Sequence, residues 1–513
     1  MNVAIVHYHL NRGGVTRVIE NQLAALDAVL DPGRRLRVAL IFGGRRKGWN
    51  EDLPRRLQSI ELSLHPVPSL DYETQGRAGN LCEDLCGLLD GLGFAAAETV
   101  LHVHNHALGK NVVLPSSLLR LAESGFALLL QIHDFPEDFR PNNYRRLLES
   151  GLAIQTGPTA ALYPQARQVH YAVLNGRDQS ILAAAGVDSR QLHLLPNPVP
   201  DMAGLPPRDL ARQRLAEQFG VGTGQPFVLY PVRGIRRKNL GEALLCTALA
   251  PEDAALGLTL PPLNPAALPV YRQWKRTAVE LDLPFCFEVG APERLTFAEN
   301  LAAADLILTT SLAEGFGMVF LESWLADRPL AGRDLPEITR DFTELGVRLD
   351  RLQPRLRVPL AWVGSDAFRE MLLAAYRKTL DTYRRQAPAD IRQQCEARTD
   401  EGTVDFGDLD ETLQQQVLRL VCGHSDRRRE LRRHNPEAIE ALSLGSKDVA
   451  ALVRENVQAV QAHYGLAPSG RRLWQLYRRA AGSVRDDRCE PLPRPTRIIE
   501  AFLELRRFHP ICT

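Results

Sequence analysis

Residues 304–322 read ADLILTTSLAEGFGMVFLE. The apolar run at 304–308 is typical of a buried strand in a parallel sheet, and Gly315 with Gly317 indicates a turn into a following helix. The first N–H groups of a helix are unpaired and lie at the positive end of its dipole. This order of elements therefore predicts an anion site.

Two glutamates bracket that turn. Glu314 falls in the loop where the strand ends, and Glu322 falls about two turns into the expected helix, so both carboxylates can face one crevice. Carboxylates only accept hydrogen bonds. An anion site beside them suits a ligand that carries both phosphate and several hydroxyl groups.

Composition and charge exclude several classes of protein. A chain of 513 residues is too long for one hydrophobic core, so two or three domains are expected. Lysine plus arginine (62) nearly balances aspartate plus glutamate (61), which leaves no overall field to hold nucleic acid or an anionic membrane. No apolar run approaches the roughly 20 residues of a membrane span, and the N-terminus lacks a signal-peptide pattern. We therefore expect a cytoplasmic protein whose eight scattered cysteines are free thiols.

The periodicity of the sequence predicts two similar α/β domains. Short β-rich runs alternate with helical patterns along residues 1–198 and again along 199–345, on either side of a proline-rich stretch. Such alternation predicts a parallel sheet covered by helices on both faces. We expect two Rossmann-like, doubly wound domains, with the ligand site in a cleft between the carboxyl ends of their strands.

Past residue 345 the β signal fades. Residues 346–450 are charged and helical in pattern and are predicted to form a helical insertion or extension, while 451–513 contain amphipathic helices that we expect to pack back on the Rossmann-like domains. Ser425 to His434 holds five arginines in ten residues. A solvated helix face is the simpler interpretation, and an anion-contacting patch is the alternative.

Two basic residues follow the first strand of the second domain. Arg233 and Lys238 lie in PVRGIRRKNLG, residues 231–241. A guanidinium can contact a diphosphate with two hydrogen bonds, and an ammonium can neutralise it as a point charge. Basic residues also fill many surface loops, but in combination with Glu314 and Glu322 the pair favours phosphate binding.

Paired glycines mark the corresponding place in the first domain. The strand at 2–6 leads into Gly13 and Gly14, just ahead of a helical pattern. Glycines there let backbone N–H groups approach a phosphate or sugar closely. They do not form the dinucleotide G-x-G-x-x-G pattern, and a plain turn explains them equally well.

Histidines end two further strands of the first domain. His133 follows the strand at 127–132 and is either a ligand to a sugar hydroxyl or a packed loop residue. His102, His104 and His106 alternate along another segment, and histidine is the commonest metal ligand. No Asp or Glu nearby completes a zinc site, so we predict no metal and leave open a cleft-lining role for one of the three.

In combination these motifs resemble the retaining family 4 glycosyltransferases of the GT-B fold. Glu314 and Glu322 reproduce that family's E-x7-E signature with its internal Gly-Phe-Gly, and Arg233 with Lys238 has the family's five-residue spacing. The resemblance covers about residues 1–345. Supporting matches are Gly13-Gly14, His133-Asp134, the connection at 192–199, residues 334–338, and a stretch at 464–477 similar to the family's closing helices.

The resemblance implies a role for each matching residue. Arg233 and Lys238 would hold the diphosphate of a nucleotide sugar, Glu322 the ribose hydroxyls, and Glu314 the donor sugar. His133 would line the reaction centre. Backbone N–H groups of the remaining motif residues would bind the sugar or phosphate: Gly315, Phe316 and Gly317 in the second domain, with Gly13 and Gly14 closing over the donor from the first.

The resemblance also implies a reaction. A hexose would move from a UDP- or GDP-sugar to a hydroxyl acceptor with retention of configuration, the leaving phosphate helping to deprotonate that hydroxyl. No cofactor other than the donor substrate is expected. A covalent carboxylate nucleophile is not required either, in contrast to retaining glycosidases.

One part of the chain departs from the family pattern. Residues 346–450 replace a short connection, which leaves the acceptor open and leaves open an oligomer through the C-terminal helical region. Membrane-acting relatives carry a basic amphipathic helix in the first domain, and the nearest candidate here, 44–49, is short. We therefore favour a small soluble acceptor, such as a sugar, a glycerate-type compound or a sugar phosphate, with peripheral membrane contact still open and no nucleic-acid partner.

Two alternative functions remain. One is another enzyme with a two-domain cleft, a nucleotide-sugar epimerase or a phosphorylase. The other is a nucleotide-sugar-binding scaffold without turnover, in which the C-terminal region serves a partner. Intact Arg233, Lys238, Glu314 and Glu322 argue against the scaffold.

Overall fold

The computed structural model describes residues 1–31, 33, 35–72, 80–154, 157–202, 204–251, 253–443 and 449–512. The chain forms two compact units. Unit 1 comprises Met1–Pro200, Thr382–Arg385 and Gln461–Glu504, and unit 2 comprises Asp201–Asp381, Gln386–Val460 and Leu505–Thr513.

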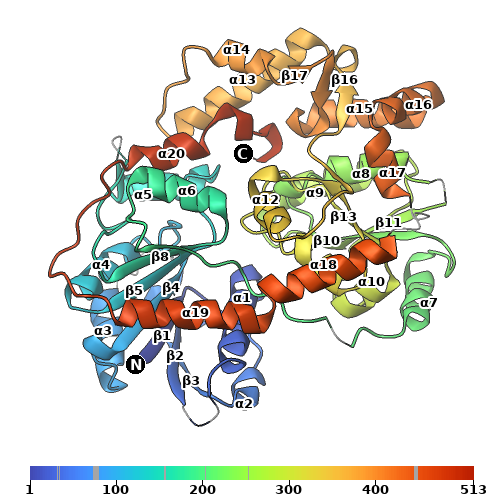
Figure 1. The fold of residues 1–513 in the computed structure, drawn as a ribbon. Helices are drawn as coiled ribbons and strands as arrows, with labels where there is room; N and C mark the ends of the chain where they lie inside the picture. Colours follow the sequence, from blue (N-terminus) through green and yellow to red (C-terminus); the bar gives the residue numbers. More distant parts are fainter. Residues whose placement is uncertain are drawn as a thin grey trace. The chain divides into compact units, whose positions relative to one another are not determined.

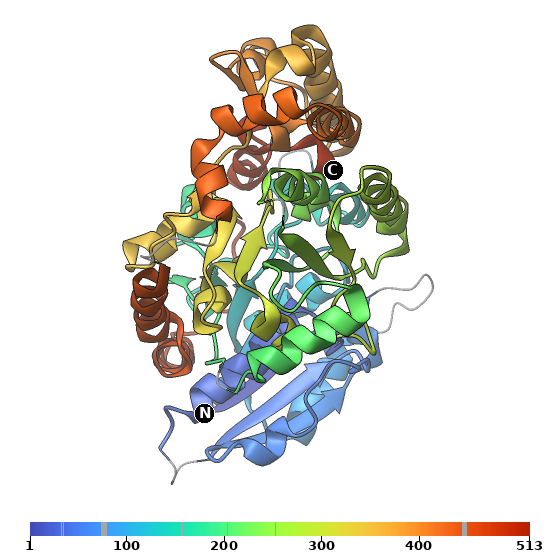
Figure 2. The same ribbon diagram turned by 90° about the vertical axis from the view of Figure 1, so that its right-hand side faces the viewer.

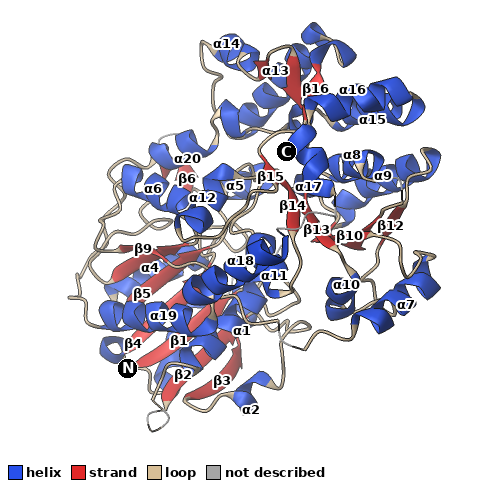
Figure 3. Ribbon diagram, turned by 45° about the vertical axis from the view of Figure 1, so that its right-hand side comes forward, coloured by secondary structure: helices blue, strands red, loops and turns tan. Residues whose placement is uncertain are grey.

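Unit 1 is built on a seven-stranded sheet with the order β3-β2-β1-β4-β5-β8-β9, in which all neighbouring strands are parallel. Helices lie along both faces of this sheet (Figures 1 and 3). The strands are β1 (Asn2–His7), β2 (Leu36–Phe42), β3 (Ile60–Pro66), β4 (Thr99–His104), β5 (Ala127–Ile132), β8 (Val169–Val173) and β9 (Leu192–Leu194), with a separate antiparallel pair β6 (Ala153–Ile154) and β7 (Gly157–Pro158).

The helices of unit 1 include one that returns from the far end of the sequence. They are α1 (Gly14–Asp27), α2 (Leu53–Arg56), α3 (Leu81–Gly91), α4 (Leu114–Glu123), α5 (Pro141–Glu149), α6 (Gly176–Ala185), α19 (Leu466–Ala481) and α20 (Thr496–Phe502). Helix α19 packs beside α1, and Leu473, Tyr477 and Ala480 join the apolar core that the sheet and α1 form (Figure 1). Such burial supplies most of the stability of a helix in a protein.

Unit 2 is built on a six-stranded sheet with the order β12-β11-β10-β13-β14-β15, again parallel throughout. Its strands are β10 (Phe227–Arg233), β11 (Ala255–Leu260), β12 (Phe285–Phe287), β13 (Leu306–Thr309), β14 (Leu330–Arg333) and β15 (Leu352–Gln353). Helix α7 (Arg208–Phe219) precedes β10, and the helices that connect the strands are α8 (Leu240–Leu249), α9 (Leu268–Glu280), α10 (Phe297–Ala303), α11 (Val319–Leu325) and α12 (Pro336–Glu344).

The region from about residue 350 to 450 is mixed, whereas the sequence predicted it as helical. A three-stranded antiparallel sheet, β16-β18-β17, consists of β16 (Arg357–Pro359), β17 (Thr399–Asp400) and β18 (Thr403–Asp405). Strands of two or three residues are too short to show an alternating pattern. In Figure 2 the orange helices of this region lie above the green helices α8 and α9 of the same unit. The helices are α13 (Ser365–Thr382), α14 (Ile391–Glu396), α15 (Glu411–Gly423), α16 (Ser425–His434), α17 (Pro436–Leu442) and, running on into unit 1, α18 (Val449–Tyr464).

Each sheet has one point where the winding reverses direction. In unit 1 it lies between β1 and β4, and in unit 2 between β10 and β13. Ligands of open α/β sheets bind outside the carboxyl ends of the strands at such points. The loops that follow β1 and β4, and those that follow β10 and β13, are therefore the places to examine for a site.

None of the helices in the described part of the chain combines the length and the apolar character that crossing a bilayer requires.

Candidate functional site

A buried ion pair joins the two loops at the switch point of unit 2. Lys238 ends a 3-10 turn (Arg236–Lys238) after β10, and Glu314 lies in the loop after β13. The Nζ of Lys238 forms an ion pair with Oε1 of Glu314, and both side chains are largely buried. The structure thus brings together two residues that stand 76 positions apart and that the sequence predicted for one site.

Hydrogen bonds hold these two loops against each other. The Tyr230 hydroxyl donates to the Lys238 carbonyl at 2.9 Å and is 3.0 Å from the Ser311 hydroxyl. The Thr310 hydroxyl donates to the same carbonyl, also at 2.9 Å. Because these side chains are buried, the backbone beneath Lys238 is fixed independently of its ion pair.

Burial and charge act in opposite directions on the pair. Burial alone would raise the pKa of Glu314, but the charges of Lys238 and Arg237 and the hydrogen bonds that Glu314 accepts bring its pKa below the usual value. Burial lowers the pKa of Lys238, and the charge of Glu314 partly offsets this. The site therefore presents a carboxylate and an ammonium, both taken partly out of water.

Arg233 and Glu322 lie at the ends of neighbouring elements of the same unit. Arg233 is the last residue of β10, is half-buried, and donates from Nη1 to the Pro261 carbonyl at 3.4 Å. Glu322 is half-buried in the first turn of α11. The sequence placed Glu322 about two turns into this helix, which is wrong because α11 begins only at Val319.

Residues 315–317 form a loop that leads into α11, as the sequence predicted for the two glycines. Gly317 has φ +79°, and a Cβ there would lie 2.4 Å from the Phe320 ring, so the fold itself requires glycine. Phe316 is buried edge-on against the ring of Phe342, with 5.4 Å between centroids. This part of the motif therefore has a packing role as well as any role in binding.

A buried charge network lies behind Lys238. The Arg333 guanidinium at the end of β14 donates to Glu242 of α8 from Nε at 3.0 Å and to both oxygens of Asp405 of β18 at 2.8 Å. Glu242 in turn accepts a 2.7 Å hydrogen bond from Asn239, the residue next to Lys238. Side-chain exposures of 3%, 4% and 6% for Arg333, Glu242 and Asp405 show that all three are removed from water.

The network gives the region after residue 346 a structural role. Asp405 belongs to the small antiparallel sheet and Gln414 to α15, and Gln414 donates to Asn239 at 3.0 Å. Asn239 has φ +47°, an uncommon value for a residue other than glycine. The backbone of Asn239 is therefore strained, and the hydrogen bonds of its side-chain amide to Glu242 of α8 and Gln414 of α15 hold it in that conformation next to Lys238.

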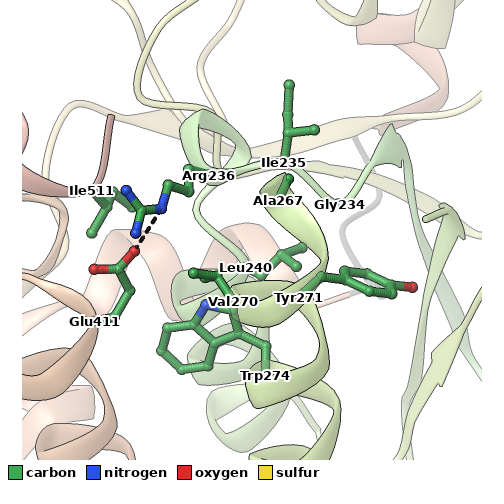
Figure 4. A pocket seen from close by; sticks show the side chains of 10 residues that line it. All are labelled: Gly234, Ile235, Arg236, Leu240, Ala267, Val270, Tyr271, Trp274, Glu411 and Ile511. Atoms are coloured by element: carbon green, nitrogen blue, oxygen red, sulfur yellow. Dashed lines mark ion pairs between the residues drawn. The ribbon is translucent and has the colours of Figure 1, made fainter. Parts of the chain in front are cut away.

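A small pocket opens beside the same turn. Arg236 forms an ion pair with Glu411 at 3.2 Å, and Trp274 of α9 lies below this ion pair, with Tyr271 of the same helix to one side (Figure 4). Ile511, close to the C-terminus, closes one side. The pocket is lined chiefly by apolar side chains, and its ion pair is internal, so it offers less to a phosphate than the Lys238 region does.

In unit 1 the paired glycines lie where α1 begins. Gly13 precedes the helix with an extended backbone, and Gly14 is its first residue. A Cβ added to Gly14 would meet nothing within 4 Å, and one added to Gly13 would lie 3.7 Å from the nearest atom. Neither residue has a positive φ. Packing and backbone conformation within unit 1 therefore give no reason for glycine at these positions.

His133 is 6% exposed and belongs to a buried histidine cluster. Its Nε2 is 2.9 Å from Nδ1 of His104, and the two rings are stacked with centroids 5.2 Å apart. Burial lowers the pKa of His133 to about 4, so it is neutral near pH 7. Its backbone N–H donates to Asn105 at 2.7 Å, which fixes the end of β5.

The other candidate histidines are fully buried. His102 contacts the Tyr477 hydroxyl of α19 at 2.8 Å and Gln131 at 2.9 Å, while His106 bonds the Leu162 carbonyl at 3.0 Å. These contacts are those of core histidines. Among the described residues no group of three or more His, Cys, Asp and Glu side chains is arranged to hold a metal ion.

Comparison with known proteins gives a relative and a fold. No protein-family model matches the chain. The chain is 26% identical over 359 residues to mannosylglucosyl-3-phosphoglycerate synthase of Petrotoga mobilis, a match that covers 67% of each chain.

Two solved structures show the fold. Sucrose-phosphate synthase (tll1590) of Thermosynechococcus elongatus has a TM-score of 0.54 and 16% identity, with 93% of this chain and 98% of that one covered. Anabaena Alr3699/HepE in complex with UDP and glucose has a TM-score of 0.53 and 11% identity, with 93% of this chain and 99% of that one covered.

Family 4 membership and retention of configuration stay predictions. The expected relationship to glycosyltransferases is confirmed, and the chain has the GT-B architecture of two parallel-sheet, Rossmann-like domains.

Proposed function

We propose that the chain transfers a hexose from a UDP- or GDP-sugar to a hydroxyl group of an acceptor of the sugar–glycerate or sugar-phosphate type, with retention of configuration. The observation that carries this proposal is the buried Lys238–Glu314 pair at the switch point of the second sheet, with Arg233 and Glu322 on adjoining elements. The acceptor class follows from the relative named mannosylglucosyl-3-phosphoglycerate synthase.

In this proposal unit 2 holds the donor. Lys238 and Arg233 neutralise the diphosphate, and Glu322 accepts hydrogen bonds from the ribose hydroxyls. Glu314 stays ionised because its pKa is lowered, and it accepts hydrogen bonds from the donor sugar. A diphosphate that contacts Lys238 shares its ammonium with Glu314. The ammonium has three donors, which is enough for both.

In unit 1, Gly13 and Gly14 leave space for the donor to approach the backbone at the start of α1, which explains glycine where the fold does not need it. His133 is neutral and contributes a hydrogen bond rather than a charge. As the glycosidic bond breaks, charge develops on the leaving phosphate, and Lys238 stabilises it most at that moment. No metal or other cofactor is part of the proposal.

The test begins with nucleotide binding. Thermal shift with UDP, GDP, ADP and their hexose conjugates should single out one nucleotide, because a ligand that binds only the folded state raises the melting temperature. Lys238→Ala should weaken that binding about 10- to 100-fold, the loss of one charge-assisted contact. Glu344→Gln, on an exposed part of α12, is the matched control and should bind as wild type does.

Transfer is then measured with the selected donor. Glu314→Gln keeps the shape of the side chain and removes its charge, and it should abolish transfer to the acceptor. Because Lys238 then loses its buried counter-charge, the melting temperature should also fall, so retained nucleotide binding is used to show that the variant is folded. A fully active Glu314→Gln variant, or a well-folded wild type that no nucleotide stabilises, would contradict the proposal. Tight donor binding without transfer to any acceptor would favour the scaffold instead.

A further inference from the structure

Helix α15, in the region whose role the sequence left open, contacts the turn that carries Lys238. Glu411 and Gln414 stand three residues apart on α15, so they lie on one face of the helix. Glu411 forms the ion pair with Arg236 at 3.2 Å (Figure 4), and Gln414 donates from its side-chain amide to the Asn239 side chain at 3.0 Å. The two contacts therefore reach the turn two residues before Lys238 and one residue after it.

Burial decides which of the two contacts has the larger effect. The side chains of Arg236 and Glu411 are 44% and 21% exposed, and ion pairs near the surface contribute little to stability. Gln414 and Asn239 are both fully buried. Water cannot replace a hydrogen bond between them, so its loss leaves the Asn239 amide oxygen unpaired. Gln414 is therefore the residue of this helix face whose removal should disturb the turn.

The backbone of Asn239 depends on such support. Asn239 joins the 3-10 turn Arg236–Lys238 to α8 and has a left-handed conformation, φ +47° and ψ +63°. This conformation is costly for a residue other than glycine, so it persists only where the surroundings hold it. The Asn239 side chain donates to Glu242 at 2.7 Å and accepts from Gln414. Glu242 lies on the helix that follows Asn239 directly, so Gln414 is the partner that connects the turn to a distant part of the chain.

Packing fixes the Gln414 side chain in this position. A Cβ on Gly241 would lie 2.3 Å from the Gln414 amide oxygen and 2.8 Å from the Trp274 ring, so the start of α8 admits this side chain because residue 241 is glycine. The Gln414 amide nitrogen donates to Asn239 and also to the Phe406 carbonyl, at 3.1 Å, which uses both of its hydrogens. These contacts direct the nitrogen of the amide at the turn.

The peptide link between Lys238 and Asn239 is thus held from two sides. Hydrogen bonds from Tyr230 and Thr310 hold the Lys238 carbonyl from the strand ends, and Gln414 holds the next residue from α15. We propose that Gln414 is a positioning residue for the donor: through Asn239 it keeps the turn in the conformation in which Lys238 meets the diphosphate. This inference rests on the proposed function, which assigns the donor diphosphate to Lys238. It gives the region past residue 350 a part in donor binding.

Titration calorimetry on the full chain with UDP and GDP measures the effect. Gln414→Leu roughly keeps the size of the side chain and removes its amide. The affinity for the diphosphate that binds wild type should fall about three- to tenfold, because one buried hydrogen bond shifts the fraction of binding-competent turns by about that factor. The matched control is Gln416→Leu, since Gln416 lies on the same helix and donates to the Trp362 carbonyl at 2.7 Å. It should bind as wild type does, and equal affinity of wild type and Gln414→Leu would overturn the proposal.

A double-mutant cycle with Lys238→Ala separates positioning from a general structural role. Gln414 acts through the Lys238 ammonium in this proposal, so Gln414→Leu should not weaken diphosphate binding further once that ammonium is absent. A merely structural role of Gln414 would weaken binding by the same factor in both backgrounds. That result would overturn the assignment of Gln414 to Lys238.

Hydrogen exchange without nucleotide separates this proposal from the function on which it rests. The backbone N–H groups of Lys238 and Asn239 donate within the turn at 2.9 and 2.8 Å, so they exchange when the turn opens. Peptides that cover 236–241 should exchange about three- to tenfold faster in Gln414→Leu than in Gln416→Leu, and equal exchange would overturn the proposal. Faster exchange in a protein that binds no nucleotide would sustain the hold on the turn and contradict the transferase. Nucleotide binding and transfer that are both indifferent to Gln414 would do the reverse.

Discussion

Removing the Arg333 guanidinium should destabilise unit 2 far more than removing a surface arginine. Arg333→Met roughly keeps the volume of the side chain, but it removes the counter-charge that Glu242 and Asp405 share. The side chains of these two residues are only 4% and 6% exposed. Taking one partner from a buried ion pair costs about 3–5 kcal/mol, because the remaining charge stays out of water. Here two carboxylates are left, so a loss at the upper end, about 5 kcal/mol, is expected.

The matched control is Arg340→Met in α12. Its partner Glu344 lies four residues along the helix, and the two side chains are 78% and 62% exposed. Exposed pairs at this spacing contribute about 0.3–0.5 kcal/mol. The two variants remove the same side chain from the same unit, so they should differ about tenfold in the free energy of unfolding that they cost.

The assay must report each unit separately, since a chain of two units need not unfold in one step. Urea unfolding followed by pulsed hydrogen exchange and mass spectrometry resolves peptides of unit 2 from those of unit 1. If Arg333→Met lowered the free energy of unfolding of unit 2 by less than about 1 kcal/mol, the reasoning would be refuted. Such a result would mean that the two carboxylates become hydrated or protonated at little cost in free energy.

The pH dependence supplies a second check on the same variant. Burial raises the pKa of Glu242 to about 7, so in the wild type its contribution to stability is present at low pH and is lost as pH rises from about 4.5 through about 7. Without Arg333, whose charge lowers the pKa of Glu242 in the wild type, the Glu242 carboxyl binds a proton more tightly still. The difference in free energy of unfolding between wild type and Arg333→Met should therefore be smaller at about pH 5 than at about pH 8. An equal difference in free energy of unfolding at both pH values would show that the variant is destabilised by lost packing and not by the loss of the ion pairs.

Two further predictions concern glycines of unit 1. Gly470→Ala should lower the free energy of unfolding by about 1–3 kcal/mol or more, because its Cβ would lie 1.9 Å from the Ala25 carbonyl and force α19 away from α1. The control is Gly87→Ala in the exposed part of α3, whose Cβ meets no atom within 4 Å and which should raise the free energy of unfolding by about 0.5–1 kcal/mol. Equal melting temperatures for the two variants would contradict this account of the packing. Gly14→Ala should not lower the melting temperature, because its Cβ has open space, yet it should lower kcat/KM for the donor about tenfold or more if the donor approaches this backbone. Unchanged kinetics for Gly14→Ala would remove the glycine loop from the donor site.

Much of the architecture was predictable because parallel strands buried on both faces are continuous apolar runs. The strands at 2–7, 127–132 and 306–309 contain such runs, and each has every residue buried. Strand β3 (Ile60–Pro66) was missed, since it lies at the edge of the sheet and only one of its seven residues is fully buried. Its sequence accordingly lacks the apolar run of a central strand.

Within the candidate site, the residues with motif spacing could be predicted and their supports could not. Lys238 and Glu314 were placed together from the pattern of strand, loop and charge, and the structure pairs them. Arg333, Glu242 and Asp405 show no local pattern that links them, because α8, β14 and β18 come together only through the sheet and the packing of residues 350–450 against it.

The sequence by itself determined the alternation of strands and helices, the division into two α/β folding patterns, and the chemistry at the loop ends, because these depend on the residues within one short window. Tertiary structure alone decided which loop ends meet and that the histidines from His102 to His106 are core residues. Those properties depend on strand order and on burial, and both are set by contacts between residues tens or hundreds of positions apart.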